Sequence, residues 1–158
     1  METKHHHIQP NPQKIELDDD AQIRCIIEQL SQGKCCHLVV SGSSMTPTLK
    51  HKRDSVFLFP SQKLRRGDIV LFRRNNGDVV LHRVHRVRDD GLLEMNGDAQ
   101  PFLEVITEKQ VLGVAKGIIR KGRTYHCDGI AMRCYAALWQ RLLPLRPFIF
   151  RLRGYFKK

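Results

Sequence analysis

Long hydrophobic runs are missing from this 158-residue chain. Residues 1–14 are polar, and they have neither the apolar central stretch nor the small-residue cleavage site of a signal peptide. No run approaches the roughly 18 uninterrupted apolar residues of a membrane span, because arginines interrupt the apolar C-terminal region. We therefore expect a cytoplasmic protein, with peripheral contact to a membrane as the further option discussed below.

Cysteine pairs at metal or redox spacing are also missing. The five cysteines form an odd set without a C-x-x-C motif, so the sequence indicates neither a disulfide framework nor a zinc site. The run His5-His6-His7 has no partner ligands at fixed spacing, and we expect no functional metal there. No metal ion or organic cofactor is predicted for this protein.

Acidic residues are scarce, since 27 Lys and Arg face 16 Asp and Glu, which leaves a net charge of +11. Such an excess attracts anionic partners from a distance. Residues 130–158 contain no acidic residue and seven basic ones, namely Arg133, Arg141, Arg146, Arg151, Arg153, Lys157 and Lys158. Because Trp, Phe and Leu lie between these charges, the segment is typical either of a helix docked on the protein's own core or of an interfacial helix on an anionic membrane. Nucleic acid is not expected as a partner.

Three regions follow from the pattern along the chain. Residues 1–17 lack periodicity and are expected to be a flexible lead, residues 18–128 form one domain, and residues 129–158 form a basic amphipathic helical tail that the domain does not need for folding. In the domain, isoleucines at helical spacing after Asp18–Asp20, with Gly33 as a stop, predict a helix over 19–32.

The remainder of the domain has a β rhythm. Short β-rich runs predict strands at 37–40, 55–59, 68–73, 78–88, 92–95 and 111–119. Asn75-Asn76-Gly77 and Asp89-Asp90-Gly91 are strong hairpin turns. Consecutive hairpins without an intervening helix predict a mainly β protein with a small, partly closed antiparallel sheet. In the tail, apolar residues from 132 to 143 predict one helix, and a second helical piece is expected at 148–156 after Pro144 and Pro147.

The most informative stretch follows the first strand and reads Ser41-Gly42-Ser43-Ser44-Met45-Thr46-Pro47-Thr48-Leu49. A serine at the point where a strand breaks into a glycine-containing turn exposes its hydroxyl and presents backbone N–H groups to a developing oxyanion. On its own such a turn is common loop chemistry.

The order of the motifs that follow gives this turn its meaning. The segment from Gly42 to Leu49 resembles the nucleophile box of the signal peptidase and self-cleaving repressor superfamily (S24/S26). The blocks R-R-G-D-I-V-L-F over 65–72, V-L-H-R-V over 80–84 and N-G-D-A over 96–99 are similar to the next three blocks of that superfamily, in the same order. Where bacterial-type enzymes carry a lysine as general base, this chain has His82, as archaeal and endoplasmic-reticulum signal peptidases do.

The resemblance implies a serine-type peptidase that acts through a Ser-His pair. Ser44 is then the nucleophile, His82 the general base and Asp98 the residue that orients His82, with Glu104 as the alternative orienter. Gly42, Ser43 and Met45 are the expected substrate-binding residues of the loop, and the Ser44 N–H with the Ser43 hydroxyl forms the oxyanion site. The expected partner is a peptide or protein precursor.

Two histidines three positions apart lie in the strand that carries the base. Because side chains alternate along a strand, His82 shares a face with Val80 and Val84, while His85 lies on the opposite face unless a β-bulge intervenes. We therefore assign a structural role to His85. The alternative from another class is a non-catalytic module that keeps the peptidase fold and binds peptides or a membrane surface. A DNA-binding repressor is disfavoured, because only one short helix precedes residue 37.

Overall fold

The computed structural model describes residues 19–155, so the expected lead at 1–17 and the His5–His7 run lie outside the described residues. The helices are α1 (Asp19–Ser31), α2 (Ile130–Arg141) and α3 (Arg146–Tyr155), with short 3-10 turns η1 (Glu108–Gln110) and η2 (Leu143–Leu145). The strands are β1 (Cys36–Val39), β2 (Asp54–Phe59), β3 (Ile69–Arg73), β4 (Val79–Val87), β5 (Leu93–Asn96), β6 (Glu104–Ile106), β7 (Val111–Arg120) and β8 (Arg123–His126).

All eight strands belong to one antiparallel sheet. Its order is β1-β2-β7-β3-β4-β5-β6, and β8 pairs with β7 off this path. The mainly β prediction is confirmed, with the sheet open between its end strands β1 and β6 in the described part of the chain. The sequence missed β6, which has only three residues, and β8, whose four residues are all exposed and therefore show no apolar alternation.

Both faces of the sheet centre are buried, which is why β3 is a continuous apolar run. Ile69 and Leu71 belong to one core cluster, and Val70 and Phe72 belong to a second cluster on the opposite face. The same alternation holds in β4, where Leu81 packs against the first cluster and Val84 lies in the second. The two cores therefore meet across β3 and β4, the strands that carry two of the motifs described above.

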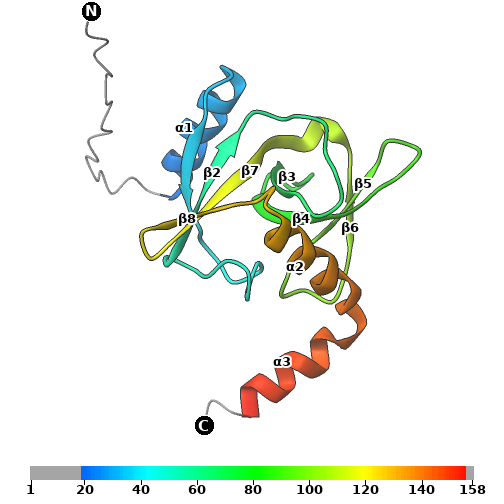
Figure 1. Cartoon of the computed structure of the whole chain (residues 1–158). Coiled ribbons are helices and arrows are strands. Elements are labelled where there is room, and N and C mark those ends of the chain that lie inside the picture. The colour runs from blue at the N-terminus through cyan, green and yellow to red at the C-terminus, as the bar shows by residue number, and fades with distance from the viewer. Residues whose placement is uncertain (1–18, 156–158) are drawn as a thin grey trace, which may run out of the picture.

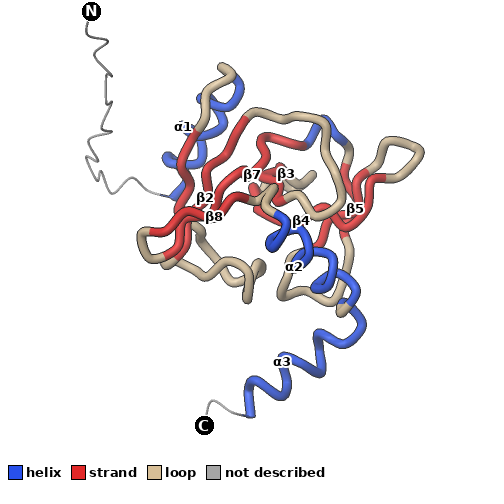
Figure 2. The backbone as a smooth tube through the Cα atoms, viewed as in Figure 1, coloured by secondary structure: helices blue, strands red, loops and turns tan. Residues whose placement is uncertain are grey.

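Helix α1 lies against β1 and β7 (Figures 1 and 2) and buries Ile26 and Leu30 in the first cluster. It ends where the sequence predicts, because Gly33 has φ +77° and its N–H bonds to Leu30 O at 3.0 Å. Helix α1 and the neighbouring strand β2 leave no room for a side chain at Gly113. A Cβ there would lie 2.9 Å from a Leu30 methyl and 2.9 Å from Phe59 O, so this position requires a glycine.

The C-terminal tail is divided between the core and the solvent. In α2, Ala136, Trp139 and Gln140 are buried, and Arg146 at the start of α3 is only 1% exposed. Beyond Arg146, α3 projects away from the sheet (Figure 1). Residues 130–146 thus contact the domain, and folding of the domain without residues 129–158 stays a prediction. No helix among residues 19–155 has the length and apolarity required to cross a bilayer.

Candidate active site

The loop after β1 presents Ser44 with its hydroxyl and its backbone N–H free of hydrogen bonds to other described residues. Gly42 has φ +86°, a conformation that favours glycine, and its N–H donates to His51 Nδ1 at 2.9 Å. The Ser43 carbonyl accepts the Thr46 N–H at 3.0 Å, which closes a turn around Ser44. Within residues 19–155 neither the N–H nor the Oγ of Ser44 has a hydrogen-bond partner. The half-buried Ser44 thus has a free hydroxyl and a free backbone donor.

Ser44 lies on the wall of a mostly apolar groove of about 540 Å³, a volume that includes the open mouth. Gly42 and Met45 also line it, and Met45 forms part of its floor because that side chain is only 1% exposed and belongs to the core. Ser43 is exposed beside the groove. The opposite wall comes from β4, through Val79, Val80 and Leu81.

This wall of β4 is an open strand edge. Val84 exchanges two backbone hydrogen bonds of 2.8 Å with the segment that leads into β3. Because peptide groups alternate in direction along a strand, those of Leu81 and Val79 point away from β3. On that side β5 pairs with β4 only from Arg83 onward. Among the described residues, Leu81 and Val79 therefore offer strand-edge donors and acceptors that no other strand takes up.

His82 follows Leu81 and points into the second core cluster. Its side chain is 1% exposed and makes an edge contact with the Phe72 ring, 5.9 Å between centroids. The expected face-sharing of His82 with Val80 and Val84 is confirmed, because both valines pack in that cluster. His82 Nδ1 lies 2.7 Å from Glu104 Oε1. Within residues 19–155 the other ring nitrogen, Nε2, has no hydrogen-bond partner.

Charges around His82 act in opposite directions on its pKa. Burial lowers the pKa of His82, and the Glu104 carboxylate opposes this effect without reversing it. Burial would raise the pKa of Glu104, but the hydrogen bonds and charges of Arg74 and His82 outweigh it, so the net pKa is lowered. Arg74 holds Glu104 through two contacts of 2.7 and 2.9 Å. The pair at neutral pH is therefore a neutral imidazole beside an anionic carboxylate.

Asp98 does not contact His82, and the prediction that it orients the histidine is corrected by this geometry. Its carboxylate accepts Arg83 Nε at 2.9 Å and Arg83 Nη2 at 2.7 Å, and it also accepts the Thr48 hydroxyl. Asp98 is fully buried and Arg83 nearly so. The physical reason is strand alternation: Arg83 and His82 leave β4 on opposite faces, and Asp98 lies on the Arg83 face. The carboxylate on His82 is Glu104, the alternative considered above.

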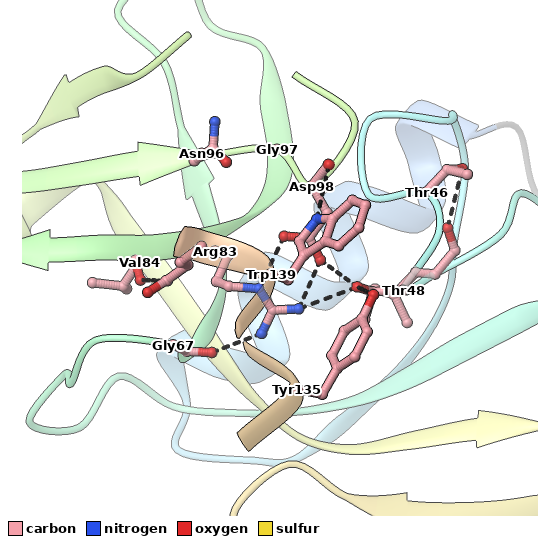
Figure 3. A network of polar contacts seen from close by, with 12 residues as sticks. Thr46, Thr48, Gly67, Arg83, Val84, Asn96, Gly97, Asp98, Tyr135 and Trp139 are labelled. Carbon is pink, nitrogen blue, oxygen red and sulfur yellow. Dashed lines mark hydrogen bonds and ion pairs between the residues drawn. The ribbon is translucent and has the colours of Figure 1, made fainter. Parts of the chain in front are cut away.

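Hydrogen bonds around Asp98 connect the Ser44 loop with helix α2 (Figure 3). Thr48, four residues after Ser44, lies 2.9 Å from the Tyr135 hydroxyl of α2. Trp139 donates its indole N–H to the Asp98 carbonyl at 3.0 Å. Helix α2 is thus fastened to both loops that border the site, a role that sequence reasoning missed. The signal was present, since Tyr135 and Trp139 are polar-tipped aromatics one turn apart on the apolar stripe.

The same loops bring Ser44 close to the His82 segment. The Ser44 carbonyl accepts the Ala99 N–H at 2.8 Å, and a Cβ on Gly97 would lie 2.9 Å from that carbonyl. Gly97 comes one residue after Asn96, the cross-strand partner of Arg83, and so lies beside His82. Within residues 19–155, however, no hydrogen bond joins the Ser44 hydroxyl to His82.

His85 occupies a β-bulge and is separated from this site. The β4–β5 register shifts between Val84 and Arg86, so His85 is the extra residue. The bulge begins after His82, whose pairing with Val70 is regular. Burial, with Arg66 adding to it, lowers the pKa of His85. His85 therefore has surroundings unlike those of His82.

Among residues 19–155 no group of three His, Cys, Asp or Glu side chains is arranged to hold a metal ion. All five cysteines are free, and burial raises the pKa of the Cys127 thiol to about 11.

The Ser44 loop and the unpaired edge of β4 thus border one groove on the open antiparallel sheet of the described residues 19–155. The sequence model of the Peptidase S24-like family matches residues 8–115, more than half of the chain, and the protein belongs to this family. A search of curated proteins found no match.

Proposed function

We propose that the protein is a serine endopeptidase that cleaves a peptide or protein precursor through Ser44, His82 and Glu104. The observation that carries the proposal is the 2.7 Å contact of buried His82 Nδ1 with Glu104. A carboxylate on Nδ1 holds the proton on that nitrogen and leaves the lone pair on Nε2. The imidazole is then prepared to accept a proton from a hydroxyl.

The chemistry follows the template of serine hydrolases. Ser44 Oγ attacks the scissile carbonyl while His82 Nε2 accepts its proton, and the oxyanion is stabilised by the unpaired Ser44 N–H with the Ser43 hydroxyl as a second donor. The imidazolium, stabilised by Glu104, returns the proton to the leaving amine. In the second half of the reaction His82 accepts a proton from water as that water attacks the acyl-enzyme, and the proton then returns to Ser44 Oγ. No metal or organic cofactor takes part in this scheme.

The groove supports an extended substrate. A peptide strand laid between the Ser44 loop and β4 would pair with the free backbone groups of Leu81 and Val79, and its side chains would enter the apolar groove. Backbone pairing positions the substrate without reading its sequence. Met45 and the valines of the wall favour small or apolar residues next to the cleaved bond.

The test is labelling with a fluorophosphonate probe, which modifies activated serines. We expect labelling of the parent protein, its loss in Ser44→Ala, and its retention at a reduced rate in Ser43→Ala, which removes only the second oxyanion donor. An unlabelled parent protein that still binds peptides would instead identify a non-catalytic module on the peptidase fold. Mass spectrometry of peptides that accumulate when Ser44 is replaced would then identify the substrate of an active enzyme.

A further inference from the structure

The C-terminal helices carry an apolar strip that faces solvent. Four large side chains are exposed to 60, 53, 63 and 44%, namely Leu138, Leu145, Phe148 and Leu152. Phe148 and Leu152 are four residues apart and share one face of α3, and Leu138 in α2 and Leu145 in η2 precede them along the chain. We call these four residues the C-terminal strip. Large apolar side chains exposed in such numbers on one short segment are typical of a surface that binds a partner.

The structure sorts the basic residues of this segment into two groups. Arg133 contacts Asp68 at 3.3 Å, and Arg146 is buried, so both serve the fold. Arg141 and Arg151 are exposed beside the C-terminal strip, and neither forms an ion pair within residues 19–155. In the sequence three more basic residues follow, and residues 129–158 contain no acidic one. The surface around the strip is therefore apolar and positive.

Arg146 attaches the start of helix α3 to α2 and to the loop after β5. Its guanidinium lies 5.1 Å from the Trp139 ring centroid and donates to the Trp139 carbonyl at 2.9 Å. It also contacts the Gly97 carbonyl at 3.3 Å, in the loop that touches Ser44. Helix α3 is thereby anchored at its first residue and extends away from the sheet (Figure 1).

We propose that the C-terminal strip and its flanking arginines dock the protein on the surface of an anionic lipid bilayer. Apolar side chains would enter the boundary between headgroups and acyl chains, while the arginines contact acidic headgroups. A second copy of this chain fits the surface poorly, because symmetric pairing would bring Arg141 and Arg151 toward their own counterparts. Docking would place the groove beside the membrane, where a membrane-associated precursor is within reach.

The experiment is flotation of the full chain with vesicles of phosphatidylcholine alone or with about 30% phosphatidylglycerol, at low and high salt. We expect binding only to the anionic vesicles and weaker binding at high salt. Phe148→Glu with Leu152→Glu, and separately Arg141→Glu with Arg151→Glu, should each lower the partition coefficient at least about tenfold. The only tryptophan, Trp139, reports by its fluorescence that the variants keep the packing of α2.

Matched controls separate the strip from general surface effects. Val87→Glu with Phe57→Glu introduces the same two charges at apolar residues of 43 and 38% exposure on β4 and β2, and Lys63→Glu with Lys109→Glu reverses two exposed charges elsewhere. These controls should bind like the parent protein. The proposal is overturned if the parent protein ignores anionic vesicles at low salt, if the controls lose binding equally, or if the strip variants abolish self-association while vesicle binding is absent throughout. The assay requires no peptidase activity, so its outcome is independent of the proposed function.

Discussion

Replacing each of the two carboxylates, Glu104 and Asp98, by its amide separates the one that serves His82 from the one that serves the fold. Glu104→Gln keeps the shape of the side chain but removes its charge, so it no longer holds the proton of His82 on Nδ1. We expect cleavage to fall by a factor on the order of 100 to 10,000, because the wrong tautomer becomes populated and the imidazolium loses its counter-charge. The Glu104 side chain is 20% exposed, and the loss of unfolding free energy should stay near about 1 kcal/mol.

The pH profile adds a readout that a structural role would not move. Activity should rise as His82 loses its proton, and burial already lowers the pKa of His82 from 6.5, while Glu104 raises it. Removing the Glu104 charge leaves burial unopposed. The acid limb of the profile in Glu104→Gln should therefore shift to lower pH even as the plateau falls.

Asp98→Asn is the matched variant with the opposite expectation. It leaves Arg83, with a 3% exposed side chain, without its counter-charge in the core, and breaking such a buried pair costs about 3 to 5 kcal/mol. The acid limb should shift less than in Glu104→Gln, because Asp98 is the smallest of the charges that raise the pKa of His82. The assays are chemical denaturation and cleavage of a peptide substrate between pH 5 and about 9. The reasoning is refuted if Asp98→Asn shifts the acid limb while Glu104→Gln leaves both rate and profile unchanged.

Three further changes test other contacts. His82→Ala should lower cleavage at least about 100-fold while His85→Ala changes it only a few-fold; equal cleavage by parent and folded His82→Ala would show that another base acts. Gly113→Ala should lower the unfolding free energy measured in denaturant by about 1 to 3 kcal/mol, because its Cβ would lie 2.9 Å from Phe59 O. Gly117→Ala on the same strand, with 3.4 Å to the nearest atom, should lower it less. The reverse order would contradict the packing. Removing residues 130–158 should lower the thermal midpoint, because Asp98 O loses the Trp139 N–H and Thr48 loses Tyr135; an unchanged midpoint would mean that α2 adds no stability.

Stability itself should depend on pH through His82. Since the pKa of His82 is lowered in the folded protein, the unfolded chain binds the proton more readily as pH falls below about 6.5. The unfolding free energy is then greatest above 6.5 and decreases as pH drops toward the folded pKa. His37 and His85, whose pKa values burial also lowers, act in the same direction. The contribution of His82 is the part that disappears in His82→Ala.

Most of the helices and strands could be predicted from local sequence patterns. Six of the strands, the first helix and the hairpin glycines follow from residue types a few positions apart, because alternation, caps and positive φ are decided by near neighbours. Gly77 and Gly91, with φ +95° and +81°, are examples. The short β6 and the exposed β8 lack such patterns, so only pairing with β5 and β7 defines them.

The contacts between the site residues could not be predicted from local sequence patterns. From the sequence, Asp98 and Glu104 were both available to His82, and the order of motifs favoured Asp98. The structure separates them because β4 sends His82 and Arg83 to opposite faces, and the buried Arg83 requires Asp98 as its counter-charge.

The sequence by itself determined the mainly β class, the position of Ser44 after a strand and the presence of a histidine in the following motif, since each depends on short-range pattern. Only the tertiary structure decided which carboxylate contacts His82, that Met45 forms the floor of the groove, and that α2 is fastened to the Thr48 and Asp98 loops. These contacts join residues up to 87 positions apart, as Thr48 and Tyr135 are. Such distances are closed by packing of the whole sheet, which no local pattern records.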